Sequence, residues 1–161
     1  MNLKRYTPLL FLLILAFSGC RKEGPPGKDG NANVKSSTIT FSNWSWNSSG
    51  YYDYANFTWG AITSDIVNTG GVFVYESNGS GGWLPLPRTV FLSNNYAQSQ
   101  RFSYYQGGFT VIVQDSDLTP PANPGTWTIK VLAVASSVRR ANPDLDWNNY
   151  EQVKVALGIK E

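Results

Sequence analysis

The chain has 161 residues, 13 of them basic and 11 acidic, with no histidine and a single cysteine. The lack of histidine and of a second thiol argues against Ser-His and Cys-His nucleophiles and against zinc sites built on imidazole or thiolate. The near balance of charge gives no reason to expect nucleic acid or an anionic membrane surface as a partner. We therefore expect a protein without catalytic activity, cofactor or metal.

Residues 1–19 have the composition of a secretory signal peptide. Two basic residues precede an apolar run at positions 9–17, and two small residues lead into Cys20. Nine residues in a helix span about 14 Å at ~1.5 Å per residue, roughly half of a ~30 Å hydrocarbon core. The run is therefore suited to export rather than to a permanent membrane span, and the sequence predicts cleavage before Cys20.

The stretch Phe17-Ser18-Gly19-Cys20 resembles a lipobox, in which the cysteine thiol is acylated before cleavage. The alternative is an ordinary secretory peptide followed by a free thiol, which would be prone to oxidation outside the cell. We interpret Cys20 as the lipidation site that anchors the protein in a membrane, since two or three acyl chains give stable attachment. The predicted location is the cell envelope, with the outer membrane as the first choice. Removal of 19 of the 161 residues leaves 142, with 11 basic and 11 acidic groups.

The segment 20–33 is rich in glycine and proline. Gly24, Gly27 and Gly30 recur at every third position, which is the collagen repeat. Three triplets are too few to hold a collagen trimer, so we interpret the segment as a spacer. Thirteen residues at ~3.1 Å each would reach about 40 Å if extended, enough to hold a domain clear of the bilayer.

From residue 34 onward the sequence predicts one domain, 34–161, made of short strands separated by turn residues. The segments expected to be strands are 38–41, 52–54, 57–59, 72–75, 83–84, 101–105, 109–113 and 126–134. Turns at 77–82 and 107–108 are expected to join two pairs of them into hairpins. The predicted fold class is all-β, an antiparallel β-sandwich, with a β-barrel as the alternative.

One or two short helices are expected beside the strands. Residues 63–70 begin with cap-type side chains and end at a glycine. Near the carboxyl end, Asn148 is expected to cap a helix with Glu151 three residues on, and Gly158 is expected to end it.

The sequence also resembles a group of secreted Bacteroidetes lipoproteins in which a collagen-like Gly-x-y stalk precedes a β-rich domain. The matching features are Ala32-Asn33-Val34 after the stalk, Ile62-Thr63 with Ile66, Gly70-Gly71-Val72-Phe73-Val74-Tyr75, Trp83 with Pro85-Leu86-Pro87, and Tyr150-Glu151-Gln152-Val153-Lys154 before Gly158. The stalk is shorter than is typical of the group. The resemblance implies a β-rich domain and an envelope location, and it brings no established activity.

Aromatic residues make up 14% of the chain, which is its most unusual feature. Trp44 and Trp46 are two positions apart, as are Tyr52 and Tyr54, so in a strand each pair would share a face. Sugar rings stack their C–H faces on indole and phenol rings, and these four residues are therefore candidates for a glycan-binding platform. The alternative is that the aromatic residues fill the core and form cross-strand pairs.

The acidic residues considered for other chemistry are Asp53, Asp65, Glu76, Asp115 and Asp117. Asp115 and Asp117 offer oxygen ligands for calcium, but two carboxylates without further ligands favour solvated loop acids. Glycan hydrolysis requires two carboxylates facing each other across a bond, and nothing in the spacing selects a pair.

Three functional hypotheses follow from these observations. The first is a membrane-anchored envelope lipoprotein with a non-catalytic structural or adhesive domain, whose partners are the membrane and an envelope protein or glycan. The second is a carbohydrate-binding lipoprotein that uses exposed Trp and Tyr side chains. The third, and least favoured, is a glycan hydrolase.

Overall fold

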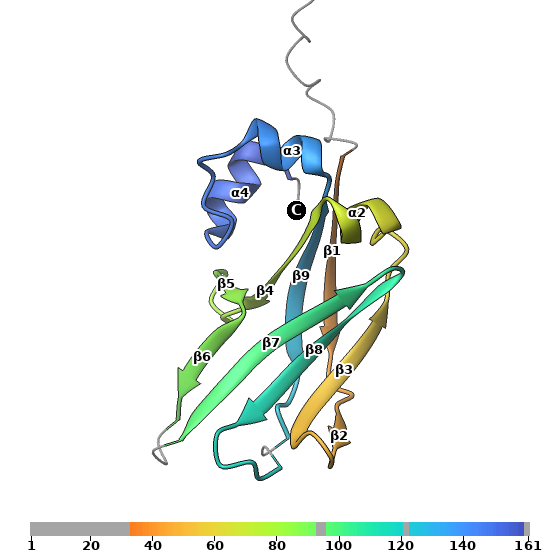
Figure 1. The fold of residues 1–161 in the computed structure, drawn as a ribbon. Coiled ribbons are helices and arrows are strands. Elements are labelled where there is room, and N and C mark those ends of the chain that lie inside the picture. The colour runs from red at the N-terminus through yellow and green to blue at the C-terminus, as the bar shows by residue number, and fades with distance from the viewer. Residues whose placement is uncertain (1–32, 93–95, 121–122, 160–161) are drawn as a thin grey trace, which may run out of the picture.

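The computed structural model describes residues 33–92, 96–120 and 123–159, which form two antiparallel sheets packed face to face (Figure 1). The predicted signal peptide, Cys20 and nearly all of the predicted spacer lie outside the described residues. Strand β1 begins at Val34, at the end of the sandwich where the helices gather, and runs towards the opposite end.

A four-stranded sheet forms one layer. Its order is β1 (Val34–Phe41), β9 (Trp127–Val134), β4 (Gly71–Ser77) and β5 (Trp83–Leu86). Strand β9 is central and nearly all its residues are buried, because one face packs on the second sheet and the other is covered by helices. This double burial explains why the second half of the strand, from Val131 to Val134, is a continuous apolar run.

A five-stranded sheet forms the second layer. Its order is β2 (Ser45–Asn47), β3 (Tyr52–Thr58), β8 (Gly108–Asp115), β7 (Ala97–Tyr105) and β6 (Arg88–Phe91). Along β8 the burial alternates: Phe109, Val111 and Val113 are fully buried against the first sheet, and the residues between them are half-buried. The outward face of this sheet carries no helix (Figure 1). It is an open face, as is common for antiparallel sheets.

Three helices accompany the sheets: α2 (Ser64–Asn68), α3 (Ser136–Ala141) and α4 (Tyr150–Leu157). Helices α3 and α4 cover the outer face of the four-stranded sheet and bury a second hydrophobic cluster there (Figure 1). Its fully buried members include Tyr75, Leu132 and Val153. Burying a Leu or Val side chain stabilises the fold by about 1.5–3 kcal/mol.

This second cluster also holds a buried cation. The Lys130 Nζ donates a hydrogen bond of 2.9 Å to the Tyr150 hydroxyl and lies 4.4 Å from the centre of the Trp83 ring.

Burial is the main cause that raises the pKa of Tyr75 far above its ordinary value, so this tyrosine stays neutral. Its hydroxyl donates to the Trp147 carbonyl at 2.6 Å, which gives the buried oxygen a partner.

The predicted antiparallel sandwich is confirmed, as are the hairpins β4–β5 and β7–β8. Two expectations about the helices need correction. One or two helices were expected, but the described part of the chain contains three, since α3 was not predicted. The cap of α4 is Asn149, whose side chain accepts a hydrogen bond from the Gln152 amide, and not Asn148. Gly158 ends the helix in the left-handed conformation, as predicted.

Candidate functional site

The structure places the four predicted platform residues on two different faces of the five-stranded sheet. Trp46 lies opposite Asp53 in the β2–β3 register, and directly opposed residues in a sheet project to the same side. Asp53 is buried between the sheets, so Trp46 belongs to the inner face, where it is 37% exposed at the edge of the sheet. Tyr52 and Tyr54 flank Asp53 along β3 and therefore lie on the outer face.

Trp44 precedes β2 and packs as a core residue. Its ring centre is 4.9 Å from that of Phe41 and 5.1 Å from that of Trp127. Its indole Nε1 donates a 2.9 Å hydrogen bond to the Gly125 carbonyl. Trp44 thus follows the core-packing alternative, and the expectation of one four-residue platform is corrected to a pair of tyrosines.

Tyr52 and Tyr54 do share a face, with ring centres 6.0 Å apart and an interplanar angle of 72°. We call their surroundings the tyrosine face. It consists of the outward side chains of β2, β3, β8 and β7, which are Ser45, Asn47, Tyr52, Tyr54, Asn56, Thr58, Ala97, Ser99, Arg101, Ser103, Tyr105, Thr110, Ile112 and Gln114. Aromatic rings, amides and hydroxyls dominate this surface.

The side chains of the tyrosine face are ordered by contacts with one another. Asn47 donates a 3.0 Å hydrogen bond to the Tyr52 hydroxyl, and Thr110 donates one of 2.7 Å to the Asn56 side chain. The Arg101 guanidinium lies 5.8 Å from the centre of the Tyr52 ring, a cation–π distance. These contacts restrict the orientation of the polar groups, so little side-chain entropy would be lost if a ligand bound there.

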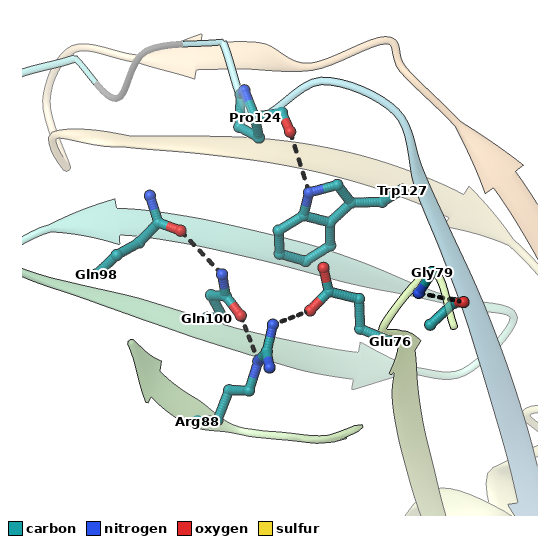
Figure 2. Close-up of polar contacts among 8 residues, drawn as sticks. Glu76, Gly79, Arg88, Gln98, Gln100, Pro124 and Trp127 are labelled. Carbon is teal, nitrogen blue, oxygen red and sulfur yellow. Dashed lines mark hydrogen bonds and ion pairs between the residues drawn. The ribbon is translucent and has the colours of Figure 1, made fainter. Parts of the chain in front are cut away.

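A second group of polar residues lies between the two sheets, and we call it the inner polar cluster. Its members are Asp53, Glu76, Arg88, Gln98, Gln100 and Asp115. Figure 2 shows the chain of contacts that joins most of them. Arg88 forms an ion pair with Glu76 of the facing sheet and donates through Nε to Gln100.

The chain of contacts continues to the end of β8. The Gln100 side chain donates to the side-chain Oε1 of Gln98 at 2.9 Å, and the Gln98 side chain donates to Asp115 Oδ1, also at 2.9 Å. The side-chain amides of Gln98 and Gln100 each donate one hydrogen bond and accept another, so the hydrogen bonds are continuous from Arg88 to Asp115. Because Glu76 comes from β4 and the rest from β6, β7 and β8, the network links the two sheets.

Two acids of the inner polar cluster have shifted titration behaviour. Burial raises the pKa of Asp53, and the neighbouring Asp115 raises it further. Asp115 is the diagonal neighbour of Asp53, because Asp53 lies opposite Val113 in the β3–β8 register. Burial also raises the pKa of Glu76, and this outweighs the lowering effect of Arg88.

Of the other acids considered from the sequence, Asp115 belongs to the inner polar cluster, and Asp117 and Asp65 lie outside it. Asp115 was expected in a solvated loop, and this is wrong: it ends strand β8 and is 3% exposed. Asp117 does lie in an exposed loop, where it accepts hydrogen bonds from the amide and hydroxyl of Thr119. Asp65 is exposed in the first turn of α2. Within the described ranges no three acidic, cysteine or histidine side chains are grouped so that they could hold a metal ion.

Sequence reasoning missed polar residues on the tyrosine face and in the inner polar cluster. Arg88, Gln98, Gln100 and Arg101 were not among the candidate site residues. The available signal was the alternation along β7, which places Gln98 and Gln100 in the same row as the half-buried Phe102.

Comparison with protein families, curated proteins and solved structures finds no match for this chain. Among the helices of the described segments, none has the length and apolar character needed to cross a bilayer.

Proposed function

We propose that this protein is an exported lipoprotein of the cell envelope, anchored through Cys20, whose β-sandwich serves as a non-catalytic structural or adhesive domain. The observation that carries the proposal is the sequence at the amino terminus: a short apolar segment and small residues lead to the chain's single cysteine. The arrangement of the domain is compatible with a tether. From Val34 onward the chain builds both sheets and both hydrophobic clusters, and β1 enters at the helical end of the sandwich (Figure 1).

The proposal of a non-catalytic role rests on the state of the charged groups between the sheets. Hydrolysis of a glycosidic bond requires two carboxyl groups with the sugar between them. Asp53 and Asp115 are both more than nine-tenths buried, and Asp115 accepts a hydrogen bond from Gln98. Glu76 is held by Arg88. Asp115 and Glu76 are thus occupied by contacts within the protein, and the pair of Glu76 with Arg88 joins the two sheets.

The anchor is tested by metabolic labelling with radioactive palmitate in a host that processes bacterial lipoproteins. We expect label in the wild-type protein and none in Cys20→Ser, which should leave the membrane fraction. The matched control is the double variant Cys20→Ser with Ser48→Cys, which restores one thiol at an exposed turn. Label in this control, or membrane retention of Cys20→Ser, would contradict specific acylation at Cys20.

A second candidate function, carbohydrate binding, is favoured by the tyrosine face. The face is uncovered, and it presents two neighbouring phenol rings among fixed amide and hydroxyl groups. Phenol rings stack on the C–H faces of sugars, and amides and hydroxyls match sugar hydroxyl groups as donors and acceptors. Retention of the protein on immobilised polysaccharides, lost in Tyr54→Ala, would support this function. Equal retention of Tyr54→Ala would place the binding elsewhere.

A further inference from the structure

The charges of the five-stranded sheet are divided unequally between its two faces. Its five strands contain four charged side chains, and Asp53, Arg88 and Asp115 are directed to the inner face. The fourth, Arg101, lies on the tyrosine face. The tyrosine face therefore carries a positive charge and no acidic residue.

Arg101 sits in a central row of this face. It lies opposite Ile112 on β8, and Ile112 lies opposite Tyr54 on β3. Its guanidinium reaches across the sheet to the Tyr52 ring and makes one long hydrogen bond, 3.4 Å from Nη1 to the Ser99 hydroxyl. Arg101, unlike Arg88, has no carboxylate partner among the described residues.

A guanidinium held over an aromatic ring without a counter-charge is suited to bind an anionic group of a ligand. Arginine presents its N–H donors in a planar fork that matches the oxygens of a carboxylate or sulfate, and such charge-assisted bonds are about twice as strong as neutral ones. The Tyr52 ring restricts the side chain and so reduces the entropy lost when the anion binds.

We propose that the tyrosine face binds an acidic polysaccharide, with Arg101 pairing with an anionic group and Tyr54 contacting a sugar ring. This inference rests on the carbohydrate-binding candidate and adds the charge of its ligand. The occupant follows from the composition of the face: one cation for the anionic group, phenol rings for the sugar ring, and Asn56, Thr110 and Gln114 for the hydroxyl groups.

The test measures retention of the full chain, solubilised in mild detergent, on immobilised polygalacturonate. The same polymer with its carboxylates methyl-esterified tests the role of charge, and dextran sulfate separates a sulfate from a carboxylate preference. Vesicles rich in anionic phospholipid form a fourth arm. The variants are Arg101→Gln and Tyr54→Ala, with Arg140→Gln as the matched control, since Arg140 is an exposed arginine on α3.

We expect wild type and Arg140→Gln to bind polygalacturonate or dextran sulfate, and Arg101→Gln to bind about tenfold or more weakly. Binding should fall as salt is added. Equal binding to the esterified polymer would overturn the role of the anion but leave carbohydrate binding intact. Binding to anionic vesicles alone, or no retention at all, would overturn both the acidic polysaccharide as ligand and the carbohydrate-binding function. If the melting temperature of Arg101→Gln is unchanged, its loss of binding is not caused by a loss of folding. Palmitate labelling of Cys20 tests the lipid anchor separately, and none of these binding results bears on it.

Discussion

Arg88 and Arg101 belong to neighbouring strands of one sheet, but they project from opposite faces and have opposite surroundings. Arg88 on β6 points between the sheets, where Glu76 neutralises it and Gln100 accepts a hydrogen bond from it. Arg101 on β7 lies on the open face, where a tyrosine ring and a serine hydroxyl are its neighbours. Two residues of the same type thus have different roles: the first connects the layers of the fold, and the second is available to a ligand.

Removal of Arg88 is the most severe test of this difference between the two arginines. Arg88→Ala leaves Glu76 and Gln100 without their partner in a largely buried place, and we expect the unfolding free energy to fall by roughly 3 kcal/mol. Urea unfolding followed by tryptophan fluorescence measures this change. The paired variant Glu76→Leu with Arg88→Met removes both charges and should cost clearly less than Arg88→Ala, because no buried charge remains unpaired. A loss below about 1 kcal/mol for Arg88→Ala would mean that the ion pair does not link the sheets.

A smaller effect is expected from the acids of the inner polar cluster, and it depends on pH. The folded-state pKa of Asp53 lies above its ordinary value of 3.8, so the folded state binds a proton more readily than the unfolded state. Between these two pKa values stability falls as pH rises, and the charged Asp53 is unfavourable at neutral pH. The raised pKa of Glu76 acts in the same direction from its ordinary value of 4.5.

We therefore expect Asp53→Asn to be more stable than wild type at pH 7, with the difference shrinking as the pH approaches 4. Thermal unfolding of both proteins across this range measures the effect. Asp65→Asn is the control, since Asp65 is exposed on α2. A difference that grows towards low pH would show that Asp53 is stabilised as an anion, contrary to its position.

Local sequence signals predicted the strands and hairpins well. Gly79 and Gly81 have positive φ angles in the turn between β4 and β5, and Gly107 has one between β7 and β8. These are the conformations that glycine adopts at little cost, so turn chemistry alone located both hairpins. The alternation of Tyr52 and Tyr54 likewise predicted a shared face, because the period of a strand is local.

What the sequence could not show depends on short or distant pairings. Strands β2 and β6 have three and four residues, too few for a periodic signal. The N-cap of α3 is Ala135, which has no side chain that could form a capping hydrogen bond. The contact of Arg101 with Tyr52 depends on the register of three strands, which no local pattern contains. The register of β7 and β8 also explains the error at Asp115, since pairing with Gln98 extends the strand into a segment that reads as a loop.

The most direct test of the account measures two properties of two variants side by side. Arg88→Gln and Arg101→Gln each remove one guanidinium from neighbouring strands, and for each we would measure the unfolding free energy and the affinity for polygalacturonate. Arg88→Gln should lose stability while its folded fraction still binds, and Arg101→Gln should keep its stability to within about 1 kcal/mol but lose binding. If both variants lost stability and affinity together, or if Arg101→Gln still bound as wild type does, the assignment of one arginine to the fold and the other to a ligand would be contradicted.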